Sequence, residues 1–246
     1  MGSVQPFPPK ARRLAAEAWR LSPAPASGVR VRLARLEDYA AVRAVTRSQG
    51  GADADLTLRQ FEQRRHAFPE GQWIAEGDAG IVAAGFSLIL DGDERPIEGD
   101  WSHLTAEGTF ASHDPAGTTL FACDAIADPA RHGFAAPRVL HLARTRLCRR
   151  LGLHRVAAAV ALRDYEALRE VLSPEEYVRR AIWGAVDDRA LRLHFSQGYQ
   201  LCAMLPRFAP RADCAGHAVL LAWLDPLYTS PGPGAREQRQ RPSKCA

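Results

Sequence analysis

The chain has 246 residues, of which 46% are hydrophobic and 24% charged, which is enough for one sizeable buried core. No apolar run reaches the roughly eighteen residues of a membrane span, and the first residues lack the order of a secretory signal, so we expect a cytoplasmic protein without a membrane partner. Five scattered cysteines without a C-x-x-C spacing indicate neither a disulfide framework nor a zinc site, and we expect no metal.

The net charge of +4 is concentrated at the end of the chain. Residues 229–246 contain Arg236, Arg239, Arg241 and Lys244 against the single acid Glu237, and so carry three of the four net charges. This segment has almost no apolar residues, which predicts a disordered basic tail. The folded part is then near neutral, and we expect no nucleic-acid partner.

A separate arm is predicted ahead of the main domain. Segment 10–21 has helix-forming residues with Leu14, Ala18 and Trp19 on one face, and residues 22–28, S-P-A-P-A-S-G, are typical of a linker. We therefore predict an arm with an accessory helix over residues 1–28, one domain over 29–228, and the tail over 229–246.

Strands and helices alternate in the first half of the domain. Val29, Val31 and Leu33 alternate with arginines, which is the period of a half-buried strand, and Asp55 is a reasonable cap for a later helix. The predicted elements are a strand over 29–33, helices over 36–48 and 56–68, a hairpin of strands over 72–76 and 81–90, and a long polar loop over 91–118 with a short edge element at 109–111.

The second half predicts a crossover unit followed by helices and a strand pair. The expected elements are a strand over 119–127, a helix over 137–151, a strand over 153–162, helices over 173–182 and 187–195, and strands over 199–205 and 217–223. Strand, helix and strand from 119 to 162 make a parallel pair, whereas the hairpins are antiparallel. The sequence thus predicts an α/β (α+β) fold with a mixed, mostly antiparallel sheet flanked by helices.

Helix faces and caps follow from the same patterns. On the helix over 137–151, Leu140, Ala143 and Leu147 share an apolar face, while Arg144 is expected to point outward. Ser173 opens a helix with the capping-box pattern S-P-E-E. Asp187 or Asp188 is expected to cap the next helix, which ends at Gly198.

The order of elements and the segment D-P-A-R-H-G-F-A-A-P-R, residues 128–138, together resemble the GNAT superfamily of acyl-coenzyme A-dependent N-acyltransferases. In that family a turn reading R/Q-x-x-G-x-G/A opens a long helix, and its backbone N–H groups bind the coenzyme pyrophosphate. The resemblance implies that the cofactor is contacted by Ala125, Ile126, Ala127, His132, Gly133, Phe134, Ala135 and Arg138. Pro137 donates no N–H, which is expected to weaken this cradle.

Three further segments look like the GNAT module that some bacteria fuse to a nitrilase-like carbon-nitrogen hydrolase. They read G-T-F-A-S-H-D-P-A-G-T-T-L-F from Gly108, L-S-P-E-E-Y-V from Leu172, and L-R-L-H-F-S-Q-G-Y from Leu191. The resemblance covers the acyltransferase module and no hydrolase domain, so hydrolase chemistry is not implied.

The resemblance also implies which residues move protons. His194 stands four residues before Gly198, where GNAT proteins commonly have the tyrosine that protonates the leaving thiolate, and an ordinary histidine pKa near 6.5 suits this role. The equally open alternative is that His194 is a core residue. For the general base the candidates are Asp124 on the central strand, Glu107 in the long loop and His113.

The expected reaction is direct transfer of an acetyl or other small acyl group, within a ternary complex, from acyl-coenzyme A to an amine of a small molecule or protein. One alternative is a malonyl-thioester decarboxylase that receives its substrate from an acyl carrier protein, although the arginine expected there corresponds to Ala209. Another is a non-catalytic acyl-coenzyme A-binding protein, because Ala135 and Pro137 depart from the turn pattern. A homodimer formed through the last strands also stays open.

Overall fold

The computed structural model describes residues 28–49, 55–92, 97, 99–127, 135–208 and 214–228, with only the backbone of residues 49 and 124–127. The predicted arm and basic tail, and the site residues His132, Gly133 and Phe134, lie outside the described residues. The predictions made for them, including the domain bounds, stay predictions.

Seven strands form one sheet in the order β1-β2-β3-β4-β5-β7-β6. Their bounds are β1 Arg30–Leu33, β2 Trp73–Gly77, β3 Gly80–Leu90, β4 Thr119–Ala127, β5 Arg155–Ala161, β6 Gln200–Leu205 and β7 Ala218–Leu224. β4 and β5 are parallel, and every other neighbouring pair is antiparallel. The predicted mixed, mostly antiparallel sheet is confirmed.

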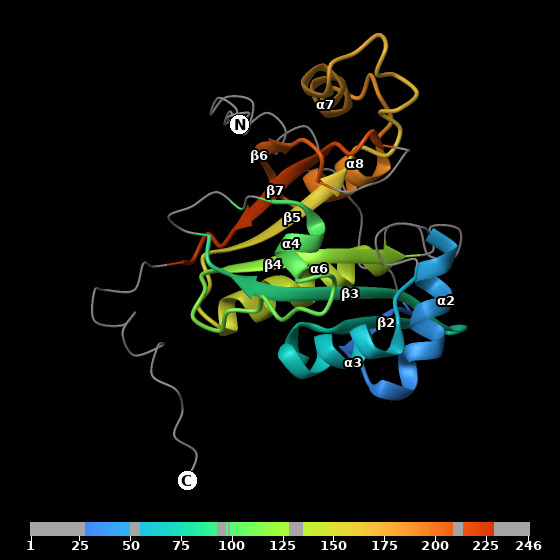
Figure 1. The fold of residues 1–246 in the computed structure, drawn as a ribbon, viewed down its shortest axis with the longest axis vertical. Coiled ribbons are helices and arrows are strands. Elements are labelled where there is room, and N and C mark those ends of the chain that lie inside the picture. Colours follow the sequence, from blue (N-terminus) through green and yellow to red (C-terminus); the bar gives the residue numbers. More distant parts are fainter. Residues whose placement is uncertain are drawn as a thin grey trace.

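Helices cover both faces of this sheet (Figure 1). Their bounds are η1 Leu36–Asp38, α2 Tyr39–Gln49, α3 Leu58–Ala67, η2 Pro69–Gly71, α4 Trp101–Thr105, α6 Ala135–Arg150, α7 Pro174–Ile182 and α8 Arg189–Ser196. The first core joins the sheet to α6, α7 and α8, and the second joins it to α2, α3 and α4. No helix in the described ranges has both the length and the apolar content needed to cross a bilayer.

The side chains of the central strand β4 contribute to the cores on both faces of the sheet. Leu120 and Ala122 pack on the side of α6 and α8, whereas Phe121 and Cys123 pack on the side of α2 and α3. Successive side chains of a strand point to opposite faces, so an almost wholly apolar strand can be buried on both sides. This double burial fixes β4 at the centre of the molecule.

The predicted cap of the helix over 56–68 was wrong. Thr57, not Asp55, precedes α3, and its hydroxyl accepts a hydrogen bond from the backbone N–H of Gln60 at 3.2 Å. The Gln60 side chain in turn accepts from the Thr57 backbone N–H at 3.0 Å. This reciprocal pair is a capping box, which satisfies two N–H groups at once and outweighs the single bond that Asp55 would make.

The edge element predicted at 109–111 was also wrong. The loop folds instead into the short helix α4 and a turn in which Ala106, Glu107 and Phe110 have positive φ angles of 48°, 55° and 66°. A β-strand needs negative φ throughout, so this segment cannot pair at a sheet edge. Phe110 is fully buried, and its burial holds the turn in this conformation.

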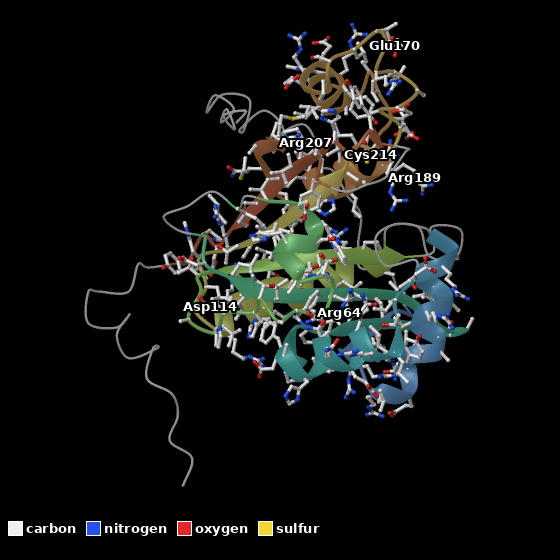
Figure 2. All side chains as sticks on the ribbon, viewed as in Figure 1. Arg64, Asp114, Glu170, Arg189, Arg207 and Cys214 are labelled. Atoms are coloured by element: carbon white, nitrogen blue, oxygen red, sulfur yellow. The ribbon has the colours of Figure 1, made fainter. Side chains whose placement is uncertain are left out.

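A buried arginine anchors that loop on the side of α3. Arg64 has no exposed surface, and its guanidinium carbon lies 4.8 Å and 4.6 Å from the ring centres of Phe86 and Phe110. Its Nε–H donates to the carbonyl of Gly108 at 2.7 Å. Figure 2 shows Arg64 in the interior of the molecule, whereas Glu170 lies at the far end near α7. Cation–π contact and the loop carbonyl together stabilise this charge.

Arg144, predicted to point outward from α6, is 4% exposed. Its Nε–H donates to Ser87 Oγ at 3.1 Å, and its Nη2 donates to the carbonyl of Phe86 at 3.1 Å. The guanidinium finds room because Gly85 has no side chain: a Cβ there would lie 2.9 Å from Arg144 Nη2. The prediction was wrong because the buried face of α6 is wider than its apolar residues indicate.

Candidate active site

The two central strands separate part-way along their length. β4 and β5 pair from Thr119 with Arg155 to Ala122 with Ala158, after which β4 continues to Ala127 beside β3 and β5 continues to Ala161 beside β7. Figure 1 shows the two strands diverging toward the same end of the sheet. Among the residues that the structure describes, no strand pairs with the two facing backbone edges beyond this point, so their N–H and C=O groups can bind a ligand.

A bulge in β4 lies where the separation begins. Phe86 of β3 pairs with Asp124 and Ser87 pairs with Ala122, so Cys123 is the extra residue in β4. A bulge of this kind bends its strand and redirects the backbone groups beside it. The end of β4, whose residues 125–127 are predicted to contact the cofactor, thus borders the gap. Contacts through Ala125, Ile126 and Ala127 stay a prediction.

The helix α6 begins close in sequence to the end of β4, with Ala135 first and Arg138 in its opening turn. The N–H groups of a first turn have no partner within the helix and attract anions, and an arginine there adds positive charge. Pro137 occupies the third helical position, where its missing N–H costs the helix no hydrogen bond. The opening of α6 therefore keeps a helix N-terminus and an arginine that favour a phosphate, but offers one N–H fewer because of Pro137.

Asp188 fixes the helix that carries His194. One carboxylate oxygen of Asp188 accepts from the N–H of Leu191 at 2.9 Å, and the other accepts from the buried hydroxyl of Tyr177 at 3.0 Å. Burial raises the pKa of Asp188. Asp187, the other predicted cap, is exposed and pairs with Arg192 at 2.7 Å. The cap of α8 is thus also its connection to α7.

His194 lies in the last turn of α8 and is partly buried. Its Nδ1 lies 2.8 Å from the carbonyl oxygen of Ala190, which can only accept, so Nδ1 carries a proton. Burial lowers the pKa of His194 to about 4, the bond to Ala190 opposes this, and the charge of Arg144 lowers the pKa further. At neutral pH Nε2 is therefore unprotonated. Within the part of the chain that the structure describes, Nε2 has no hydrogen-bond partner.

Two further residues complete this cluster, and the sequence patterns did not single them out. The Tyr199 ring lies edge-on to His194, with the ring centres 5.1 Å apart, and at the same separation from His141 of α6. Tyr199 Oη is 3.4 Å from His141 Nδ1. Burial, followed by the charges of His194 and Arg144, lowers the pKa of His141 to about 3. The sequence indicated this only through spacing, because His141 lies seven positions before Cys148 and so on the same side of the helix.

The structure separates the other candidate bases from this cluster. His113 accepts a hydrogen bond from the N–H of Ile89 at 3.0 Å and stacks on Phe68, at the end of β4 opposite to the gap. Glu107 is exposed in the left-handed turn beside α3. The backbone of Asp124 lies at the bulge, and its role as a base stays a prediction.

A groove of about 390 Å³ lies elsewhere, between β1, β2 and α6. Its lining includes Val31, Trp73 and Leu142 together with Arg146 and Arg150. None of the predicted site residues lines it, so it is distinct from the gap between β4 and β5. Among the described residues, no group of three or more His, Cys, Asp or Glu side chains is placed to hold a metal ion.

Comparison with known sequences gives distant relatives, and no family model matches the chain. The chain is 27% identical over 158 residues to Probable hydrolase YhcX of Bacillus subtilis (strain 168), a match that covers 63% of this chain and 31% of that protein. It is 21% identical over 169 residues to Uncharacterized N-acetyltransferase YkwB of the same organism, covering 69% of this chain and 75% of that protein. The chain thus spans less than a third of the first relative.

Solved structures match this chain in fold over most of its length. The GphF GNAT-like decarboxylase in complex with isobutyryl-CoA superposes with a TM-score of 0.69 at 24% identity, covering 79% of this chain and 98% of that one. The loading GNATL domain of CurA from Lyngbya majuscula gives 0.65 at 19% identity, covering 80% and 97%. This chain has the GNAT fold. The resemblance stated from the sequence is confirmed at the level of the fold.

The GNAT fold accounts for the arrangement of the site. A parallel crossover brings the opening of α6 toward the end of β4, and β7, by pairing with β5 and β6, allows α8 to pack beside α6. His194 is thereby placed in the same core as the α6 face that carries His141. The chemical parts of the site come from segments that are far apart in the sequence.

Proposed function

We propose that this chain is an acyltransferase that moves an acetyl or other small acyl group from acyl-coenzyme A to an amine. The carrying observation is His194, whose Nδ1 is held by the carbonyl of Ala190, in a fold whose parallel central strands separate at a bulge. The similarity to a GNAT-like decarboxylase bound to an acyl-coenzyme A and to an N-acetyltransferase supports this proposal. The amine belongs to a small molecule or a protein.

The described residues fit the coenzyme. The opening of α6 and Arg138 would hold its pyrophosphate, because the N–H groups of a helix N-terminus and a guanidinium both favour phosphate oxygens. The backbone edge of β4 beyond Cys123 would contact the thioester, with N–H groups stabilising negative charge on the carbonyl oxygen. The acyl-coenzyme A would supply an activated acyl group joined to a good leaving thiolate.

His194 would accept a proton before it donates one. With a pKa of about 4, only about one molecule in a thousand carries the imidazolium at pH 7, so His194 is not a ready acid. Nε2 instead takes a proton from the attacking amine nitrogen as the new C–N bond forms. The resulting imidazolium is a strong acid and gives that proton to the departing sulfur as the C–S bond breaks, so no net proton is lost.

A malonyl-thioester decarboxylase is the second candidate, since the two solved structures described above are a GNAT-like decarboxylase and a loading domain. The geometry of His194 favours transfer instead. Its single N–H is committed to Ala190, so neutral His194 offers the substrate a lone pair but no donor for a carboxylate. Neutral His194 therefore cannot donate a hydrogen bond to the carboxylate of a carrier-bound malonyl substrate.

Thiol release from acetyl- and malonyl-coenzyme A with a panel of amines tests the proposal. Wild-type protein is expected to release thiol only when an amine is present, with the amide identified by mass spectrometry. His194→Gln is expected to lower kcat by about 10²–10⁴. His66→Gln, which changes an exposed histidine of α3, is the matched control and is expected to behave as wild type. Carbon dioxide released from malonyl-coenzyme A without an amine would establish the decarboxylase, and binding without turnover would establish a non-catalytic protein.

A further inference from the structure

His141 interacts with the chain just beyond α8. Its Nδ1 lies 3.4 Å from the hydroxyl of Tyr199, and the backbone of Gln197 raises the pKa of its ring, against the larger effect of burial. The side chain is 7% exposed and lies in the middle of α6. This side chain of α6 therefore interacts with both ends of the turn 197–199.

The same turn holds His194. The backbone N–H groups of Gln197 and Tyr199 both donate to the carbonyl of His194, at 3.0 Å and 3.1 Å. Gly198, with φ of 87°, lets the chain reverse here at no steric cost. The Tyr199 ring then lies edge-on against the His194 ring, with an interplanar angle of 77°. Any shift of this turn would move the imidazole of His194.

We propose that His141 is a positioning residue that couples α6 to His194 through Tyr199 and the turn 197–199. The proposal rests on the proposed function, in which α6 holds the coenzyme and His194 moves the proton. His141 touches no reacting atom; it sets the direction of Nε2 and keeps water away from the ring. Coenzyme binding at the opening of α6 and proton transfer by His194 at the end of α8 are then coupled through the contact between His141 and Tyr199.

The charges around His194 make its position matter. Within the described residues, Arg144 of α6 carries a fixed positive charge close enough to lower the His194 pKa. The titratable neighbours of His194 are His141 and Tyr199. Burial raises the pKa of Tyr199, so its hydroxyl stays protonated. Arg144 therefore disfavours a second proton on His194, and neither His141 nor Tyr199 supplies a negative charge that would stabilise it. Loosening the turn would admit water and remove part of this effect.

The test measures kcat, the KM for acyl-coenzyme A and the His194 pKa in three variants. His141→Gln removes the imidazole, and Tyr199→Phe removes only the hydroxyl that lies beside it. Thr145→Val is the matched control, because Thr145 is a buried residue of α6 whose hydroxyl bonds within its own helix to Leu142. The His194 pKa is followed by imidazole NMR titration, with the signal assigned by its loss in His194→Gln.

His141→Gln is expected to lower kcat by about tenfold or more while the KM changes less than about twofold, because a misplaced base slows chemistry more than it weakens binding. The His194 pKa should rise from about 4 toward the ordinary histidine value, less so in Tyr199→Phe, and stay unchanged in Thr145→Val. These results support the coupling.

Unchanged kcat and unchanged His194 pKa in His141→Gln, with only a lower melting temperature, would overturn the proposal. Should wild-type protein transfer no acyl group, the proposed function fails, while the NMR titration still decides the coupling: a shifted pKa in the variants supports it and an unshifted one rejects it. If His141→Gln does not fold, Tyr199→Phe carries the same two readouts.

Discussion

Acid should destabilise this protein in a window set by two histidines. His141 and His194 have folded-state pKa values of about 3 and about 4, whereas an unfolded histidine titrates near 6.5. Both values are depressed, so the unfolded chain binds more protons than the folded chain between these limits. The stability contributed by keeping both rings neutral is present above about pH 6.5 and is lost as the pH falls toward 4. We therefore expect the free energy of unfolding to fall when the pH is lowered from 7 to 5.

The magnitude follows from the two titrations. At pH 5 an unfolded histidine is almost fully protonated and folded His141 is almost wholly neutral, so this one residue lowers the free energy of unfolding by about 2 kcal/mol relative to pH 7. His194 is partly exposed, so its contribution is about the same or smaller. The losses from the two histidines together are a large part of the roughly 5–15 kcal/mol by which a typical domain is stable against unfolding.

Urea unfolding at pH 7 and pH 5 measures this loss. His141→Gln cannot titrate at this position, so it should lose at least about 2 kcal/mol less than wild type between the two pH values, whatever its stability at pH 7. A raised His194 pKa in this variant would add to the difference. His66→Gln, on the exposed side of α3, controls for replacing a histidine. Comparing differences cancels the effect of every carboxylate that both proteins share. Equal losses in wild type and His141→Gln would show that His141 is not buried in its neutral form.

Two substitutions test the contacts that hold the site. Asp188→Ala should lower the free energy of unfolding by about 2–4 kcal/mol in urea, because it removes the cap of α8 and leaves the buried Tyr177 hydroxyl unpaired, whereas Asp187→Ala at the exposed neighbour should change it by less than about 0.5 kcal/mol. Gly85→Ala should cost about 1–3 kcal/mol, because its Cβ would lie 2.9 Å from the buried Arg144 guanidinium; an unchanged urea midpoint would contradict that placement.

The order of elements could be predicted because each element has a periodic apolar pattern. Residues 119–127 were expected as a strand and form β4 with those bounds, since nearly every side chain there is apolar and turn residues flank the run. The loop over 91–118 has no such period. Its conformation depends on Phe110 and Arg64, which lie 46 positions apart and contact each other only after folding. Local patterns cannot report contacts of that range.

The site was predictable where it depends on local spacing. His194 was found by counting from Gly198, a helix-ending glycine that does adopt a positive φ. His141 and Arg144 were missed because a charged or polar residue on a long helix is usually solvated. Their burial depends on Gly85 in β3 and on Tyr199 beyond α8, both more than 50 positions away. Such partners appear only once the sheet has brought them together.

The low pKa of His194 also constrains the acceptor. A base with a pKa of about 4 cannot remove a proton from an alkylammonium ion with a pKa near that of lysine, about 10. It can remove one from the much more acidic nitrogen that has already attacked the thioester. An alkylamine must therefore arrive as its free base, and kcat/KM should rise about tenfold per pH unit between pH 6 and 8. An arylamine, largely unprotonated throughout that range, should show a flat profile. A flat profile for the alkylamine would mean that a stronger base than His194 lies in the site.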